Sequence, residues 1–185
     1  MSEKEKMLKG EMYNANNEIE LKNEIIAAKD LCFEFNSLKP SMLKEKEEII
    51  KKLLGKVSKN SYIEQPFMCD YGYNIEIGEN FYANHNLIIL DANKVKFGDN
   101  VFVGPNCGFY TVGHPLNVEE RNQRLKYAKP IEVGDNVWIG GNVVVLPGVK
   151  IGNNTVIGAG SVVTKDIPSN VIAVGNPCKV IKDVK

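Results

Sequence analysis

The chain has 185 residues with 23 basic and 23 acidic side chains, so its formal net charge is zero when both histidines are neutral. This balance argues against a nucleic-acid-binding protein, the lack of a long apolar run argues against a membrane span, and the charged opening MSEKEKMLKGEMY argues against a signal peptide. Four widely spaced cysteines without a CxxC pair favour reduced thiols in a cytoplasmic protein over a zinc site or a disulfide framework.

The first 60 residues have the composition of helices with charged faces. Within residues 17–36, four apolar side chains recur at helical spacing: Ile25, Ala28, Cys32 and Phe35. A second helix is expected after Pro40, with Ser41 as its N-cap and Gly55 at its end. Its apolar stripe consists of Met42, Ile49 and Leu53. We therefore predict a helical cap over residues 1–60 rather than a separate binding module.

The pattern changes to a six-residue repeat from about residue 75. From Val133 the sequence runs VGDNVW, IGGNVV, VLPGVK, IGNNTV, IGAGSV and VTKDIP, with Val or Ile at the first position of every hexapeptide. FGDNVF and VGPNCG, which begin at Phe97 and Val103, keep the same phase. A period of six fits neither an amphipathic helix nor a hairpin strand, and it indicates a solenoid.

In such a solenoid three hexapeptides form one triangular coil, and stacked coils pair as parallel strands roughly 4.8 Å apart. The first-position aliphatic side chain fills the interior, while Gly and Asn at the corners tolerate positive φ. Cys107, at the fifth position of its hexapeptide, is also expected to point inward and to serve packing.

The repeat is interrupted by a polar excursion over residues 111–130, in which His114 stands between Gly113 and Pro115. Long loops in compact folds are often functional, and a proline on one side would fix the direction of the imidazole. We interpret His114 as a general base that accepts a proton from an attacking hydroxyl or amine. The alternative is a hydrogen-bonded structural histidine.

The ordered set MYNANN, FEFN, CDYGYNIEIGENFYANHNLIILD, GHP, YAKPIEVGDNVWIG and VIGAGSVVTKDIPSNVIAVGNPCKV resembles the maltose and galactoside O-acetyltransferases. The resemblance implies a mainly β fold, a left-handed parallel β-helix over residues 61–185 with a C-terminal tail, preceded by the helical cap. It also implies transfer of an acetyl group from acetyl-CoA to a sugar hydroxyl, without a metal, by a homotrimer whose active sites lie between subunits.

The resemblance further implies roles for particular residues. The catalytic positions are His114 and Asn84, the latter donating to the developing charge. Positions near the acceptor are Asn17, Asp70, Tyr82 and Asp91, although Asp91 could equally be a corner residue of the solenoid. Positions along acetyl-CoA are Trp138, Gly141, Ala159, Thr164, Lys165, Lys179 and Lys182.

Two departures bear on the acceptor. Asn17 stands where several family members carry an acidic residue, and Ala27 stands close to where others carry arginine, so the identity of the sugar stays open. An acetyltransferase for a xenobiotic or an amino sugar is the nearest alternative, followed by a non-catalytic assembly module. A zinc carbonic anhydrase on the same fold is disfavoured, because its usual site needs three histidines and the chain has two.

Overall fold

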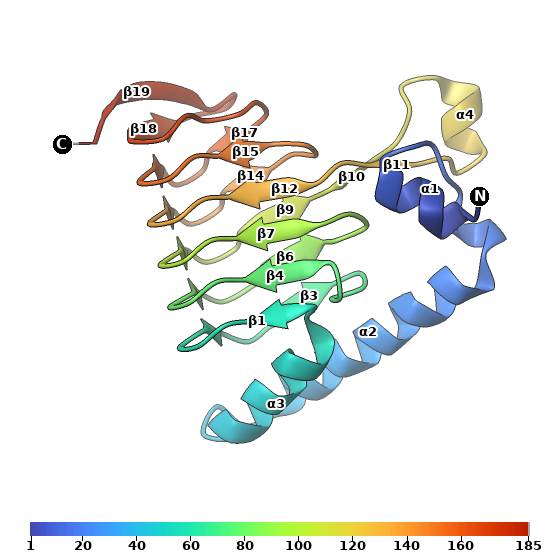
Figure 1. Ribbon diagram of the computed structural model, residues 1–185, viewed down its shortest axis with the longest axis horizontal. Coiled ribbons are helices and arrows are strands. Elements are labelled where there is room, and N and C mark those ends of the chain that lie inside the picture. Colours follow the sequence, from blue (N-terminus) through green and yellow to red (C-terminus); the bar gives the residue numbers. More distant parts are fainter. Residues whose placement is uncertain (185) are drawn as a thin grey trace.

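The computed structural model of the protein describes residues 1–184, which form a β-solenoid preceded by helices (Figure 1). The helical segment comprises α1 (Glu3–Lys9), the 3₁₀ turn η1 (Ala15–Asn17), α2 (Ile19–Ser37) and α3 (Leu43–Leu53). Apolar side chains of α2 and α3 belong to the same core as the solenoid interior, so these helices cover its open N-terminal end. Among the described residues, no helix has the length and apolar character needed to cross a membrane.

Three sheets make the faces of the solenoid. Sheet 1 contains β1 (Lys56–Val57), β4 (Ile75–Ile77), β7 (Val95–Phe97), β12 (Ile131–Val133) and β15 (Lys150–Ile151). Sheet 2 contains β2 (Tyr62–Ile63), β5 (Tyr82–Ala83), β8 (Phe102–Val103), β13 (Trp138–Ile139), β16 (Val156–Ile157), β18 (Val171–Val174) and β19 (Lys179–Asp183). Sheet 3 contains β3 (Phe67–Cys69), β6 (Leu87–Leu90), β9 (Gly108–Tyr110), β14 (Val144–Val145) and β17 (Val162–Val163).

Strands within these sheets pair in parallel, except that β19 turns back antiparallel to β18. The chain passes from sheet 1 to sheet 2, then to sheet 3, and back to sheet 1 on the next coil. We name each of the three corners after the two sheets that the chain connects there: edge 1/2, edge 2/3 and edge 3/1. The parallel β-helix predicted from the repeat is confirmed, and so is the N-terminal helical segment predicted from the apolar spacing.

The first-position residues of the six hexapeptides are all buried, as predicted: Val133, Ile139, Val145, Ile151, Ile157 and Val163. Cys107 is buried as well, with its thiol 3.2 Å from the Gly140 carbonyl oxygen. Asparagines with positive φ turn the chain at edge 1/2, and their side-chain amides hydrogen-bond from coil to coil. The ladder consists of Asn60, Asn80, Asn100, Asn136, Asn154 and Asn170.

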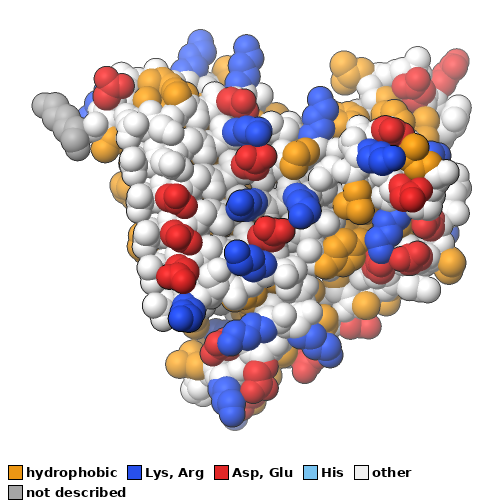
Figure 2. Space-filling view, viewed as in Figure 1, with side chains coloured by type: hydrophobic (Ala, Val, Ile, Leu, Met, Phe, Trp, Pro, Cys, Tyr) orange, Lys and Arg blue, Asp and Glu red, His pale blue; other side chains and the backbone are white. Residues whose placement is uncertain are grey.

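The outer faces of the sheets differ in character. On sheet 1, Glu76, Lys96, Glu132 and Lys150 lie in register on successive strands, so opposite charges alternate up the face (Figure 2). On sheet 2, the corresponding positions hold aromatic side chains: Tyr62, Tyr82, Phe102 and Trp138. Phe102 is 50% exposed and Trp138 is 59% exposed. Sheet 1 is therefore suited to water and sheet 2 to contact with another molecule.

Some sequence-based boundaries differ from the structure. Ser41 does not cap α3; the N-cap is Met42, which makes no side-chain capping bond and follows a turn in which its N–H donates to the Lys39 carbonyl. The C-cap is Leu54, and Gly55 comes next because a Cβ there would lie 2.2 Å from the Tyr73 carbonyl oxygen. The first strand, β1, begins at Lys56, before the predicted boundary at residue 61.

Candidate active site

The excursion leaves the solenoid at edge 3/1, between β9 and β12. Its arms, β10 (Val112–Gly113) and β11 (Tyr127–Ala128), pair antiparallel, and the short helix α4 (Val118–Asn122) lies at the far end (Figure 1). Asn117 caps α4 by accepting hydrogen bonds from the backbone N–H groups of Glu119 and Glu120. The excursion is thus an ordered hairpin with a helix, which the polar sequence alone does not predict.

His114 follows β10 and its side chain is exposed. Its Nδ1 lies 2.9 Å from the carbonyl oxygen of Leu125, on the returning arm of the same excursion. A carbonyl oxygen only accepts hydrogen bonds, so Nδ1 carries the hydrogen and donates it. In the neutral ring Nε2 is then left as a free acceptor, which is the state that a general base requires.

Two predicted acceptor residues follow strands of sheet 3 at the same edge. Asp91 is fully buried, and its Oδ1 accepts from the backbone N–H groups of Asp70 and Tyr71 at 3.0 and 2.8 Å. Its Oδ2 has no hydrogen-bond partner among the described residues. Burial, with a smaller effect of the nearby Asp70 charge, raises the pKa of Asp91 to about 6, although backbone hydrogen bonds act in the opposite direction. These contacts are those of a corner residue that fixes the turn carrying Asp70.

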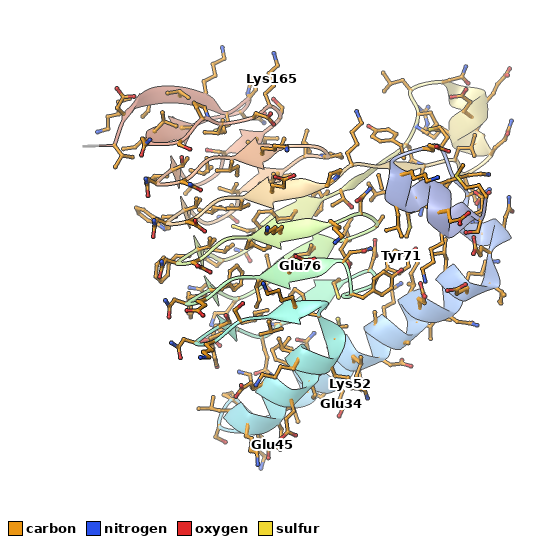
Figure 3. The ribbon with its side chains drawn as sticks, in the orientation of Figure 1. Glu34, Glu45, Lys52, Tyr71, Glu76 and Lys165 are labelled. Carbon is orange, nitrogen blue, oxygen red and sulfur yellow. The ribbon has the colours of Figure 1, made fainter. Side chains whose placement is uncertain are left out.

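Asp70 is half-buried at this corner and lines an apolar hollow of about 410 Å³ against α2. Burial raises the pKa of Asp70, while Lys126 and Lys29 act in the opposite direction. Tyr71, beside it, lies on the side of the coils that faces α2 (Figure 3). Asn17 is the last residue of η1 and is exposed, and Ala27 is an exposed residue of α2.

Asn84 lies at edge 2/3, directly after β5, and lines a groove of about 450 Å³ on the sheet 2 side. The other walls are largely apolar: Tyr82, Phe102, Val103, Gly104 and Trp138. The Asn84 side-chain oxygen accepts from the His85 N–H at 2.7 Å. Within the described chain its NH₂ group has no acceptor, so it is available to a bound molecule.

Gly141 and Ala159 lie on successive coils of the same edge, where Gly141 accepts a hydrogen bond from the Gly160 N–H. The corners approach so closely that a Cβ on Gly104 would come within 2.5 Å of the Gly141 nitrogen. Lys179 and Lys182 are exposed on β19, at the C-terminal end of sheet 2. Along the sheet 2 side, the groove with the Asn84 amide and the aromatic rings is therefore followed, toward the C-terminal end, by the cationic side chains of Lys179 and Lys182.

Thr164 and Lys165 follow β17, so both lie at edge 3/1 on one of the last coils and are exposed (Figure 3). The structure thus divides the predicted site into two groups within one chain. Edge 3/1 and the helical segment hold His114, Asp70, Asp91, Asn17, Thr164 and Lys165. Sheet 2 and edge 2/3 hold Asn84, Tyr82, Trp138, Gly141, Ala159, Lys179 and Lys182. Within the described residues, no cluster of three or more His, Cys, Asp or Glu could hold a metal ion.

Comparison with known proteins gives the family. The maltose acetyltransferase hexapeptide capping motif matches residues 6–58, and the bacterial transferase hexapeptide (six repeats) matches residues 130–165. Galactoside O-acetyltransferase of Escherichia coli (strain K12) is 49% identical over 86% of this chain and 78% of its own length. The chain belongs to the maltose and galactoside O-acetyltransferase family.

Solved structures of this acetyltransferase family agree over the full chain. A maltose O-acetyltransferase from Clostridium difficile 630 is 50% identical with a TM-score of 0.96, covering 100% of this chain and 98% of that one. A galactoside acetyltransferase in complex with coenzyme A is 44% identical with a TM-score of 0.97, covering 100% and 92%. The family resemblance is confirmed, as is the left-handed parallel β-helix that it implies, and the protein is an acetyltransferase.

Several residues of the site were missed by the sequence analysis. Phe102 stands in register with Trp138, 36 residues further along, and the shared last position of their hexapeptides was a signal that could have identified it. Lys126, whose charge acts on Asp70, lies in the aperiodic excursion and gave no such signal. Neither did Leu125, which contributes a backbone carbonyl rather than a side chain.

Proposed function

We propose that the protein transfers the acetyl group of acetyl-CoA to a hydroxyl of a sugar, with His114 as general base. The observation that carries this proposal is the 2.9 Å hydrogen bond from His114 Nδ1 to the Leu125 carbonyl, which leaves Nε2 free to take a proton. The maltose and galactoside acetyltransferases to which the chain is similar support a sugar acceptor.

In the proposed reaction, the oxygen of the acceptor hydroxyl bonds to the carbonyl carbon of the thioester. At the same time, Nε2 of His114 accepts the proton of that hydroxyl. The NH₂ group of Asn84 donates to the carbonyl oxygen, which gains negative charge as the new bond forms. When the carbon–sulfur bond breaks, His114 returns the proton to the leaving thiolate, and the imidazole is neutral again. No cysteine takes part.

We assign the donor to the sheet 2 side. Exposed Trp138 and the apolar walls of the groove suit the pantetheine arm, and Gly141 and Ala159 leave room beside it at edge 2/3. Lys179 and Lys182 on β19 suit the phosphates of the nucleotide as point charges. The complex of a relative with coenzyme A supports this class of donor.

We further propose that the active unit is a homotrimer with sites between subunits. His114 and Asn84 lie at different edges of one chain, so a second copy is needed to bring a base to the groove. Thr164 and Lys165, at edge 3/1, would then reach the donor from the neighbouring copy. The exposed aromatic side chains of sheet 2 support such a contact, because monomeric proteins rarely leave large apolar patches uncovered.

The acceptor is assigned to edge 3/1, beside His114. Asp70 and Asn17 offer hydrogen-bonding groups there, Asp91 holds the backbone of Asp70, and Tyr82 would face them from the neighbouring groove. Because Asn17 brings no charge, neutral hydroxyl acceptors are favoured over cationic amines. We place the reaction in the cytoplasm, which agrees with the four free cysteines.

The first experiment follows release of the coenzyme A thiol with acetyl-CoA and a panel of acceptors: maltose, glucose, a thiogalactoside, glucosamine and chloramphenicol. We expect the neutral sugars to be acetylated, and His114→Ala to lower kcat by roughly 10²–10⁴-fold while acetyl-CoA still binds. His85→Ala is the matched control, since His85 Nδ1 also contacts a backbone carbonyl, that of Gln65 at 2.6 Å. Wild-type turnover in His114→Ala would refute the general-base assignment.

A further inference from the structure

The N-terminal segment, which we define as residues 2–14, lies against the excursion that carries His114 (Figure 1). The two share a small hydrophobic core that is separate from the solenoid interior. Its members are Met7, Tyr13, Ala15, Leu21, Tyr71, Ala92 and Ala128, with Ile25 and Val112 packed against them. Both arms of the excursion therefore pack on a surface that the N-terminal segment helps to build.

Hydrogen bonds hold the returning arm on both sides of Leu125, whose carbonyl accepts from His114. On one side, Tyr13 and Lys126 exchange two backbone hydrogen bonds of 2.9 Å in an antiparallel bridge. On the other side, the Asn14 side-chain NH₂ donates to the Gln123 carbonyl at 2.9 Å. The carbonyl that orients the imidazole thus lies between two anchors supplied by the N-terminal segment.

One buried side chain joins the N-terminal segment, the excursion and the solenoid. The Nδ2 of Asn93, at edge 3/1, lies 3.2 Å from the Met7 carbonyl oxygen, 3.3 Å from that of Leu8 and 3.2 Å from that of Ala128. Met7 and Leu8 are in the last turn of α1, where the Met7 carbonyl also accepts from the N–H of the C-cap Gly10, and Ala128 is in β11. The Asn93 N–H also donates to Thr111, where the excursion begins, at 3.0 Å.

We propose that Asn93 is a positioning residue for His114, acting through the N-terminal segment and the returning arm to keep the Leu125 carbonyl on Nδ1. This role rests on the general-base function proposed above for His114. Without the amide hydrogens of Asn93, the returning arm and α1 lose their common anchor. The imidazole then samples other orientations and its second tautomer, in which Nε2 carries the hydrogen and is no longer a base.

Asn93→Asp tests the role, because aspartate has the same shape but offers an acceptor where three carbonyl oxygens need a donor. We expect kcat to fall at least about tenfold while the KM for acetyl-CoA stays within about twofold, since the proposed donor groove is elsewhere. The readout independent of activity is the nitrogen-15 spectrum of labelled histidine, which contains only His85 and His114. We expect the ring nitrogens of His114 to shift toward a tautomer mixture, with those of His85 unchanged.

Thr155→Val is the matched control for lost stability. Thr155 is also buried and donates to a backbone carbonyl, that of Pro168 at 3.0 Å, on a coil away from the excursion. The Thr155→Val variant should have a lower Tm than wild type, with the nitrogen-15 signals of His114 unchanged. If Asn93→Asp does not fold, Asn14→Ala, which removes only the anchor at Gln123 and a local turn contact, should shift the same signals by a smaller amount.

A folded variant with wild-type His114 signals and wild-type kcat overturns the positioning role. If the His114 signals shift in Asn93→Asp but kcat does not change, the positioning role stands and the general-base assignment fails. If His114→Ala abolishes turnover while Asn93→Asp leaves both the signals and kcat unchanged, the general-base assignment stands and the positioning role fails.

Discussion

Asp91 is a residue whose burial should be visible in the stability of the protein. Because burial raises its pKa to about 6 in the fold, against 3.8 as the ordinary value, the folded state binds an additional proton between these limits. The contribution that this proton on Asp91 makes to the free energy of unfolding is fully present below about pH 4, and it is lost as the pH rises through about 6. A shift of this size corresponds to about 3 kcal/mol.

Asp91→Asn should remove this dependence, since an amide has no proton to lose at these pH values. We expect the free energy of unfolding of the variant, relative to wild type, to rise by about 3 kcal/mol between pH 4 and pH 7.5, as measured by urea denaturation at several pH values. Asp135→Asn is the control: Asp135 is exposed and its Oδ1 also accepts a backbone N–H, that of Asp99. The same rise in both variants would rule out Asp91 as its source.

At the scale of single residues, the sequence predicted the placement of side chains whose direction depends on their position in the repeat, and it did not predict contacts with distant parts of the chain. Cys107 was expected inside and is buried, because its position in the hexapeptide fixes its direction. Asn93 gave no signal, since its partners are backbone carbonyls up to 86 residues away. Asp91 was equally compatible with an acceptor contact and a corner; the structure shows the corner contacts, to the backbone N–H groups of the turn that carries Asp70, and the acceptor contact stays a prediction.

Among the elements, the asparagine ladder at edge 1/2 combines backbone geometry with side-chain hydrogen bonds. Asn136 has φ of 56° and bonds Asn100 and Asn154 at 3.2 and 3.1 Å. Asn136→Ala loses both bonds and puts alanine, which tolerates the left-handed region less well than asparagine, at this φ, so the free energy of unfolding should fall by about 2 kcal/mol. Asn136→Gly loses the same bonds without that strain and should cost about 1 kcal/mol less in urea denaturation. Equal losses would show that the φ angle contributes nothing.

The elements also show where the repeat could be followed and where it could not. Val133 pairs with Ile151, 18 residues on, which is three hexapeptides, and this part of the solenoid was predicted. In the first coils Ile77 pairs with Phe97, 20 residues on, so the six-residue phase slips at every turn. The hairpin and α4 within the excursion have no period at all, and their structure depends on contacts with the distant N-terminal segment.

At the scale of the whole molecule, the two groups of site residues and the two kinds of face point to the same arrangement. Sheet 1 carries alternating charges suited to water, whereas sheet 2 leaves Phe102 and Trp138 exposed beside the groove that contains Asn84. His114 stands on an ordered arm at another edge, away from that groove. A packing that covers sheet 2 of one copy with edge 3/1 of the next would bury apolar surface and complete the proposed site in one step.

This arrangement predicts that two inactive variants restore each other. His114→Ala lacks the proposed base and Asn84→Ala lacks the proposed donor to the oxyanion, but a mixed trimer contains sites with His114 from one chain and Asn84 from its neighbour. Random mixing of equal amounts, after mild unfolding and refolding together, should give about a quarter of wild-type activity, because that fraction of interfaces pairs the two intact residues. Each variant refolded alone is the control and should stay inactive. No recovery in mixtures that form trimers would mean that both residues of a site come from one chain.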